Sequence, residues 1–137
     1  MYTLRYTVYT IASLASERYI SLTTFKRDGT PVSTPVWVVS DDNGRLLVWS
    51  AASTWKVRRI RRDSSVLVAP ASFRGKERGA RLAATARLVD DPGVDELLLR
   101  KYGWQKRALD FLNRKGQGAW TTIELTDRTA SEAPVTV

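Results

Sequence analysis

Residues 45–63 read RLLVWSAASTWKVRRIRRD, and this stretch decides the fold. Its first part is a short apolar run bounded by polar residues, which is typical of a β-strand over 46–50. Its second part carries Val57 and Ile60 three residues apart, and this spacing indicates the buried face of an α-helix over 54–62. The sequence therefore predicts a strand that leads almost directly into a short basic helix.

The junction between this strand and this helix has the features of an anion-binding site. Ser53 and Thr54 are favourable N-cap residues, and the first N–H groups of a helix point outward without partners. Lys56 and Arg59 lie one turn apart beside them, with Arg59 a candidate second phosphate ligand. The junction predicts a phosphate site, although the same cations would also suit the solvated face of an amphipathic helix.

The composition excludes several common catalytic mechanisms. The 137 residues include no histidine and no cysteine. A Ser-His-Asp or Cys-His arrangement, a disulfide framework and a zinc site with histidine or cysteine ligands are therefore excluded. If the protein is an enzyme, the sequence favours a bound cofactor that carries the reactive centre. We assign no residue as a catalytic group and none as a metal ligand.

The charge balance predicts an anionic partner. The chain carries 22 Lys and Arg against 14 Asp and Glu, a formal net charge of +8. Nucleic acid, an acidic membrane surface and a negatively charged coenzyme would all suit this charge. The cations gather in two groups, Lys56, Arg58, Arg59, Arg61 and Arg62 in the first, and Arg74, Lys76, Arg78 and Arg81 in the second. Two such groups indicate a groove between them.

Length and patterning predict one domain over residues 1–137, with a loosely held tail at about 128–137. Hydrophobic residues make up 43% and charged residues 26%, as in ordinary globular proteins. Charged residues interrupt every apolar run near the N-terminus, so we expect no membrane span and no signal peptide. The expected location is the cytoplasm.

The expected elements are six to seven short antiparallel strands and two main helices, a mostly β fold. The strands are expected at 19–25, 32–39, 46–50, 66–69, 82–88 and 120–125, with the first ten residues as a further candidate and 11–17 as a short helix or connection. Asp28-Gly29 predicts a hairpin turn, and the first three strands would form a meander. Pro35 predicts an edge, a bulge or a point where a ligand takes the place of a pairing strand. The second helix would start at 91–93 and bend at Gly103. Such strands favour a small closed barrel.

The order of these segments resembles a known superfamily. TTFKRDGTPVSTPVW (23–37), RLLVWS (45–50), WKVRRIRRDSSVLVAP (55–70) and RKYGWQKRALDFL (100–112) are similar to the split β-barrel flavin and deazaflavin oxidoreductases of the pyridoxamine 5′-phosphate oxidase-like superfamily. The resemblance covers residues 19–125 and is strongest to the group that uses the deazaflavin coenzyme F420. It implies an FMN-binding-like split barrel and a homodimer with cofactor sites at its interface.

The resemblance also implies a set of cofactor-binding residues. They are Pro35, Val36, Trp37, Ser50, Thr54, Trp55, Lys56, Arg59 and Trp104. Lys56 matches the lysine that grips the cofactor phosphate, and the backbone of 35–37 matches the strand against the ring. Trp104 matches a position near the second subunit's site. The tryptophans would alternatively serve in the core or in dimer packing. The chain departs from the family pattern at 63–65, where Asp-Ser-Ser replaces Asp-Pro-Arg.

The sequence thus predicts an F420-dependent oxidoreductase that transfers a hydride between F420 and a small organic substrate. One alternative is an FMN-dependent oxidase or reductase of the same fold. Another is a module without enzymatic activity that stores a flavin-like cofactor or holds nucleic acid on its basic face. Trp55 is the only aromatic residue inside the basic run, so we do not expect nucleic acid. A heme-binding variant would lack histidine and cysteine as axial ligands.

Overall fold

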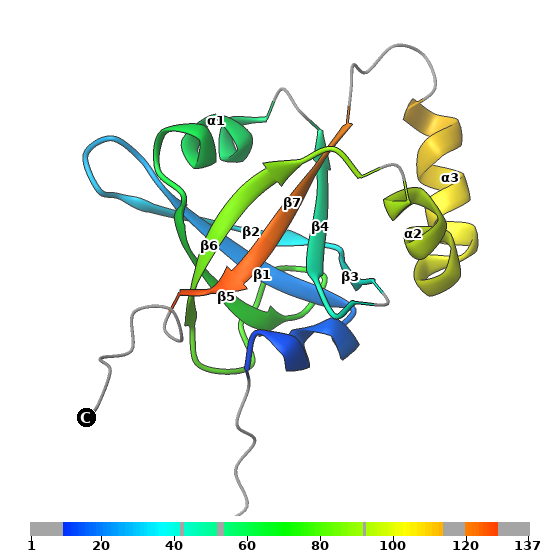
Figure 1. The fold of residues 1–137 in the computed structure, drawn as a ribbon, viewed down its shortest axis with the longest axis horizontal. Helices are drawn as coiled ribbons and strands as arrows, with labels where there is room; N and C mark the ends of the chain where they lie inside the picture. Colours follow the sequence, from blue (N-terminus) through cyan, green and yellow to red (C-terminus); the bar gives the residue numbers. More distant parts are fainter. Residues whose placement is uncertain (1–9, 42, 52–53, 92, 114–119, 129–137) are drawn as a thin grey trace, which may run out of the picture.

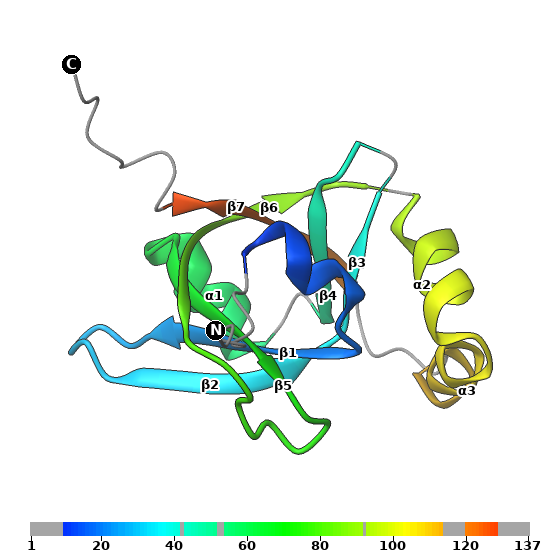
Figure 2. The ribbon, with the colours of Figure 1, turned by 90° about the horizontal axis from the view of Figure 1, so that it is seen from below.

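The computed structural model describes residues 10–41, 43–51, 54–91, 93–113 and 120–128 (Figures 1 and 2). Its elements are a 3₁₀ helix η1 (Ala12–Ser16), the strands β1 (Tyr19–Phe25), β2 (Pro31–Val36), β3 (Val38–Ser40), β4 (Leu46–Ala51), β5 (Ser65–Ala71), β6 (Leu82–Val89) and β7 (Trp120–Asp127), and the helices α1 (Trp55–Arg62), α2 (Val94–Tyr102) and α3 (Trp104–Asn113). The mostly β fold class with up to seven antiparallel strands is confirmed. The expected strand in the first ten residues and most of the tail lie outside the described residues.

The seven strands form one antiparallel sheet in the order β2-β1-β5-β6-β7-β4-β3. The two ends of this order, β2 and β3, are consecutive in the chain and are separated only by Trp37. The sheet therefore curls until its ends meet along one interrupted strand, which gives a barrel. The single strand expected over 32–39 is wrong in this respect, because its first half pairs with β1 and its second half with β4.

The hairpin between β1 and β2 forms as the sequence predicts. Gly29 has a φ of 89°, a backbone conformation that glycine adopts without steric cost. The carboxylate of Asp28 accepts a hydrogen bond of 2.9 Å from the N–H of Thr30. Pro35 lies in β2, at one end of the sheet order, as its missing N–H predicts.

Two apolar clusters hold the molecule together. The first fills the barrel with the inward side chains of the strands and includes Ile60 of α1. The second lies outside the barrel, where α2 covers β3 and β4, and its buried members are Val39, Leu47, Trp49, Val94, Leu98 and Tyr102. The second main helix is two helices, α2 and α3, since Gly103 between them has a φ of 55°. The described residues thus contain three α-helices in place of the expected two.

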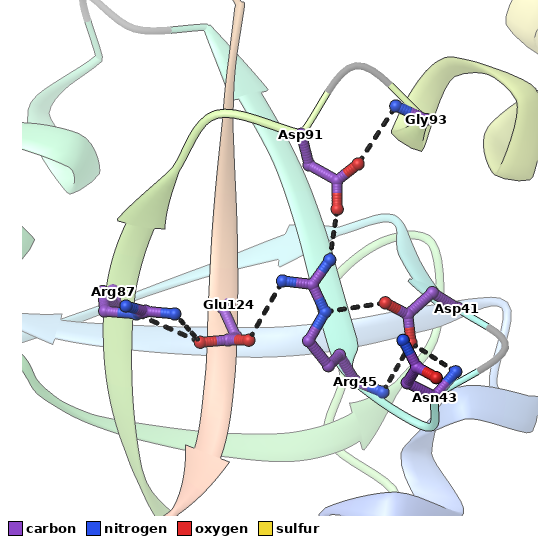
Figure 3. Close-up of polar contacts among 7 residues, drawn as sticks. All are labelled: Asp41, Asn43, Arg45, Arg87, Asp91, Gly93 and Glu124. Atoms are coloured by element: carbon purple, nitrogen blue, oxygen red, sulfur yellow. Dashed lines mark hydrogen bonds and ion pairs between the residues drawn. The ribbon is translucent and has the colours of Figure 1, made fainter.

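A network around Arg45 fastens α2 to the barrel (Figure 3). Arg45 forms ion pairs with Asp41 at 2.6 Å, with Glu124 at 3.3 Å and with Asp91. Arg87 of β6 pairs with the other oxygen of Glu124 at 2.8 Å. The side chain of Glu124 is only 9% exposed, so its charge depends on these two arginines. Hydrogen bonds from Arg45 lower the pKa of Asp41.

We expect Glu124→Gln to lower the free energy of unfolding by about 1–2 kcal/mol, because a buried acceptor for two arginines becomes neutral. The matched control is Glu96→Gln, which removes the same charge from an exposed pair with Arg100 and should change stability little. Urea denaturation at pH 7 measures both variants. Equal stability changes in the two variants would contradict a structural role for the network.

Candidate functional site

A cleft of about 370 Å³ opens where β2, β4, β7 and the start of α1 meet. Its lining residues are Tyr19, Pro35, Val36, Trp37, Trp49, Ser50, Ala51, Thr54, Lys56, Phe73, Leu109 and Trp120. The fold thus brings together the predicted site residues Pro35, Val36, Trp37, Ser50, Thr54 and Lys56. They come from the interrupted strand, from the end of β4 and from the start of α1.

Stacked aromatic rings form one wall of the cleft. Trp37 stacks on Tyr102 with ring centroids 4.2 Å apart and on Trp49 at 6.4 Å. Trp49 in turn stacks on Trp120 at 3.8 Å. The row runs from the buried Tyr102 to Trp120, which is 36% exposed. A flat, rigid aromatic surface of this kind suits a planar ring system.

The wall is anchored from behind by α2 and α3. The hydroxyl of Tyr102 donates a hydrogen bond of 2.7 Å to the carbonyl of Arg18 and accepts one of 3.0 Å from the N–H of Val38. Burial raises the pKa of Tyr102 to about 12, so this phenol stays protonated at neutral pH. The ammonium of Lys106, whose side chain is 1% exposed, lies 4.6 Å from the centre of the Trp49 ring. The wall is therefore fixed in place.

Lys101 is a second lysine held by the fold. Its ammonium donates hydrogen bonds to the carbonyls of Ala15 at 2.9 Å, Glu17 at 2.6 Å and Val38 at 2.5 Å. Burial is the main cause that lowers its pKa to about 8. Because all three donor positions of the ammonium serve the backbone, Lys101 ties α2 to η1 and β3 and is not part of the cleft.

Lys56 differs from both of these lysines. It is half-buried at the cleft, and within the described part of the chain it has no ion pair and no hydrogen bond. Burial first, and then the charge of Arg59, lower the pKa of Lys56 below its usual value of 10.5. A desolvated ammonium without a counterion is costly, so this position favours an anion.

Polar groups beside Lys56 complete this part of the cleft. The hydroxyls of Ser50 and Thr54 lie 3.3 Å apart, and the Thr54 hydroxyl donates to the carbonyl of Ala51 at 3.0 Å. Thr54 is the N-cap of α1 as predicted, but its side chain does not bond the first-turn N–H groups. As far as the described residues show, these N–H groups have no side-chain partner, so they can donate to an anion near Lys56. Ser53, the other predicted cap, lies outside the described residues.

Three predicted site residues lie away from the cleft. Trp55 and Arg59 line a second depression of about 620 Å³ on the other flank of α1. We call this depression the basic hollow, and its lining residues are Lys26, Arg27, Trp55, Arg58, Arg59 and Arg62. Trp104 begins α3, is 76% exposed and lines neither depression. Its role at a second subunit's site stays a prediction.

The sequence did not single out Trp49 and Trp120 as site residues. Only the pairing of β4 with β7, which sets Trp120 opposite Ala51, brings their rings together. This pairing joins segments that are far apart in the chain, so no pattern of neighbouring residues in the sequence predicts it. The sequence contains only one indication of their role, which is that both are tryptophans. The large flat side chain of tryptophan is used in a core, an interface or a ligand site.

Most of the chain matches one known protein family. The family model described as pyridoxamine 5′-phosphate oxidase matches residues 11–128. The chain belongs to this family. The match covers the whole barrel and every predicted site residue. A search of curated proteins gave no match.

This member of the pyridoxamine 5′-phosphate oxidase family has the same fold as several solved structures of low sequence identity. The conserved hypothetical protein Rv2991 from Mycobacterium tuberculosis is 22% identical, with a TM-score of 0.58 over 86% of this chain and 78% of that chain. HutZ, the heme storage protein from Vibrio cholerae, is 13% identical, with a TM-score of 0.61 over 82% and 83%. An FMN-binding protein from Nostoc punctiforme is 18% identical, with a TM-score of 0.53 over 85% and 73%. In the described part of our chain, no helix is long and apolar enough to cross a membrane.

We expect Trp49→Ala to lower the free energy of unfolding by about 3–5 kcal/mol, because it removes a ring stacked between two others and buried to 8% exposure. Trp104→Ala, at an exposed position, is the control and should change stability little. Chemical denaturation and near-ultraviolet circular dichroism measure the effect. A near-ultraviolet spectrum unchanged in Trp49→Ala would contradict the stacked wall.

Proposed function

We propose that this member of the pyridoxamine 5′-phosphate oxidase family is an F420-dependent oxidoreductase. It transfers a hydride between the deazaflavin coenzyme F420 and a small organic substrate, acts in the cytoplasm, and works as a homodimer with cofactor sites at the interface. The observation that carries the proposal is the pairing of an uncompensated ammonium, Lys56, with a flat aromatic wall in one cleft.

The residues of the cleft fit a phosphate-bearing planar cofactor. Lys56, the hydroxyls of Ser50 and Thr54 and the open N–H groups of α1 are donors for the phosphate. The segment Pro35–Trp37 and the tryptophan wall present backbone and rings to the planar part. When bound, the deazaflavin supplies the carbon that gives or takes the hydride.

The chain itself contributes binding, orientation and exclusion of water. The wall is rigid because α2 and α3 hold it, so the planar group and the substrate can be held at a fixed distance. No histidine or cysteine exists in the chain to act as a nucleophile. The reaction therefore depends on positioning, with no side chain assigned as a catalytic residue.

The charge of the chain favours F420 over FMN. F420 carries a tail with glutamates beyond its phosphate, and the net charge of +8 suits these additional negative charges, which FMN lacks. FMN is the alternative cofactor, and an FMN-binding protein shares the fold. Heme storage, named for HutZ, is less suited to a chain without histidine and cysteine.

We expect Lys56→Ala to weaken F420 binding by about tenfold or more, because a charge-assisted hydrogen bond to the phosphate is lost. Arg61→Ala, which removes a charge from α1 outside both depressions, is the matched control. Tryptophan-fluorescence titrations with F420 and separately with FMN, at low and moderate salt, measure the affinities. Tight binding of FMN alone would move the assignment to an FMN enzyme, and binding of neither would overturn the cofactor site.

The affinity for F420 should fall as the pH rises. This fall should begin at a lower pH than an ordinary lysine, with a pKa of 10.5, would give. Lys56 binds the anion only when protonated, and burial with the nearby charge of Arg59 lowers its pKa in the free protein. Titrations between pH 7 and pH 10 measure the decline. The Lys56→Arg variant keeps its positive charge over this range, so its F420 affinity should change less with pH. Lys101 and Tyr102 are present in both proteins, so their titration cannot explain a difference between them. Identical profiles for the two proteins would contradict the role of Lys56.

A further inference from the structure

The basic hollow is built from two elements that are separate in the sequence. The exposed flank of α1 forms one side, and the turn between β1 and β2 forms the other (Figures 1 and 2). The turn is fixed by hydrogen bonds of 2.9 Å between the backbones of Lys26 and Thr30 and of Gly29 and Lys26. Arg62 of α1 donates a hydrogen bond to the carbonyl of Phe25, which links the two sides. The hollow is therefore a preformed surface.

Every charged residue that lines the basic hollow is a cation. The nearby carboxylates of Asp28 and Asp63 each accept a backbone N–H, from Thr30 and from Ser65. Hydrogen bonds from Thr30 lower the pKa of Asp28, and the charge of Lys26 contributes to this lowering. Within the described residues, none of the five lining cations forms an ion pair with a carboxylate. Five like charges around one depression create a field that attracts a polyanion.

Trp55 adds a second kind of contact. Its side chain is 66% exposed, and the guanidinium of Arg58 lies 4.9 Å from the centre of its ring. An exposed ring beside several cations is the arrangement on which unpaired bases stack in proteins that bind single strands. The side chains of Asp and Glu in an acidic peptide would use the cations but have no ring to stack on the tryptophan.

We propose that the basic hollow binds single-stranded nucleic acid. The phosphates contact the lysine and the arginines, and one base stacks on Trp55. The volume of about 620 Å³ is in the range of ordinary ligand sites. The sequence predicted no nucleic acid because a single aromatic residue lies in the basic run, but the fold adds Lys26 and Arg27 from the hairpin. This site is separate from the cleft and does not depend on the proposed cofactor.

The test uses the full chain and a fluorescein-labelled 12-nucleotide oligo(dT), with fluorescence anisotropy at 50–200 mM KCl. We expect Trp55→Ala to weaken binding by about tenfold through loss of base stacking. The double variant Arg27→Gln and Arg58→Gln should lower the slope of log affinity against log salt by about 1.4, since each phosphate contact on a single strand contributes about 0.7.

The control is Arg61→Gln with Arg107→Gln, which removes two charges outside the hollow and should change the affinity less than twofold. Thermal melting confirms that each variant is folded. An unchanged affinity in Trp55→Ala, or equal losses in the two double variants, would overturn the site and leave only general attraction of a basic protein for a polyanion.

The two proposals fail separately. Lys56→Ala acts in the cleft, so it should weaken F420 binding by about tenfold or more and leave oligo(dT) binding within about threefold. Loss of oligo(dT) binding in this variant as large as in Trp55→Ala would overturn the basic hollow as a separate site. Retained oligo(dT) binding together with absent F420 binding in the wild type would refute the cofactor assignment alone.

Discussion

The stacking of Trp37 on Tyr102 is the contact on which both the fold and the cleft depend. Trp37 interrupts the strand that closes the barrel, and Tyr102 ends α2. The hydroxyl of Tyr102 also bonds both the N–H of Val38 and the carbonyl of Arg18. One pair of residues therefore fixes the break in the strand, the position of α2 and the back of the aromatic wall.

Among the described residues, three lysines are half-buried or buried, and they show how the same residue type takes different roles. Lys101 and Lys106 have their ammonium groups satisfied, by three backbone carbonyls in one case and by Asp95, Asp110 and the ring of Trp49 in the other. Lys56 has neither kind of partner among the described residues. The difference follows from position, because Lys56 faces a cleft and the other two face packed elements.

Local sequence signals predicted the elements that depend on neighbouring residues. The spacing of Val57 and Ile60 predicted α1, and Asp28-Gly29 predicted its hairpin turn, because helix period and turn geometry are set within a few residues. The break at Trp37 was not predictable, since it arises from pairing with β1 on one side and β4 on the other. The start of the basic helix predicted Lys56 as an anion-binding residue, and resemblance to the family added Pro35–Trp37, which the cleft brings together with Lys56. The contribution of Trp120 required the distant pairing of β4 with β7.

Helix α1 separates the two depressions because of its helical period. Val57 and Ile60 face the barrel and are buried, which fixes the rotation of the helix about its axis. With 100° between successive residues, Lys56 then lies on the flank toward the cleft, and Trp55 and Arg58 lie on the flank toward the basic hollow. Arg59 lines the hollow, yet its charge lowers the pKa of Lys56. The two depressions thus share one electrostatic field while their lining residues stay distinct, so a change at Arg59 acts on both and changes at Lys56 or Trp55 act on one.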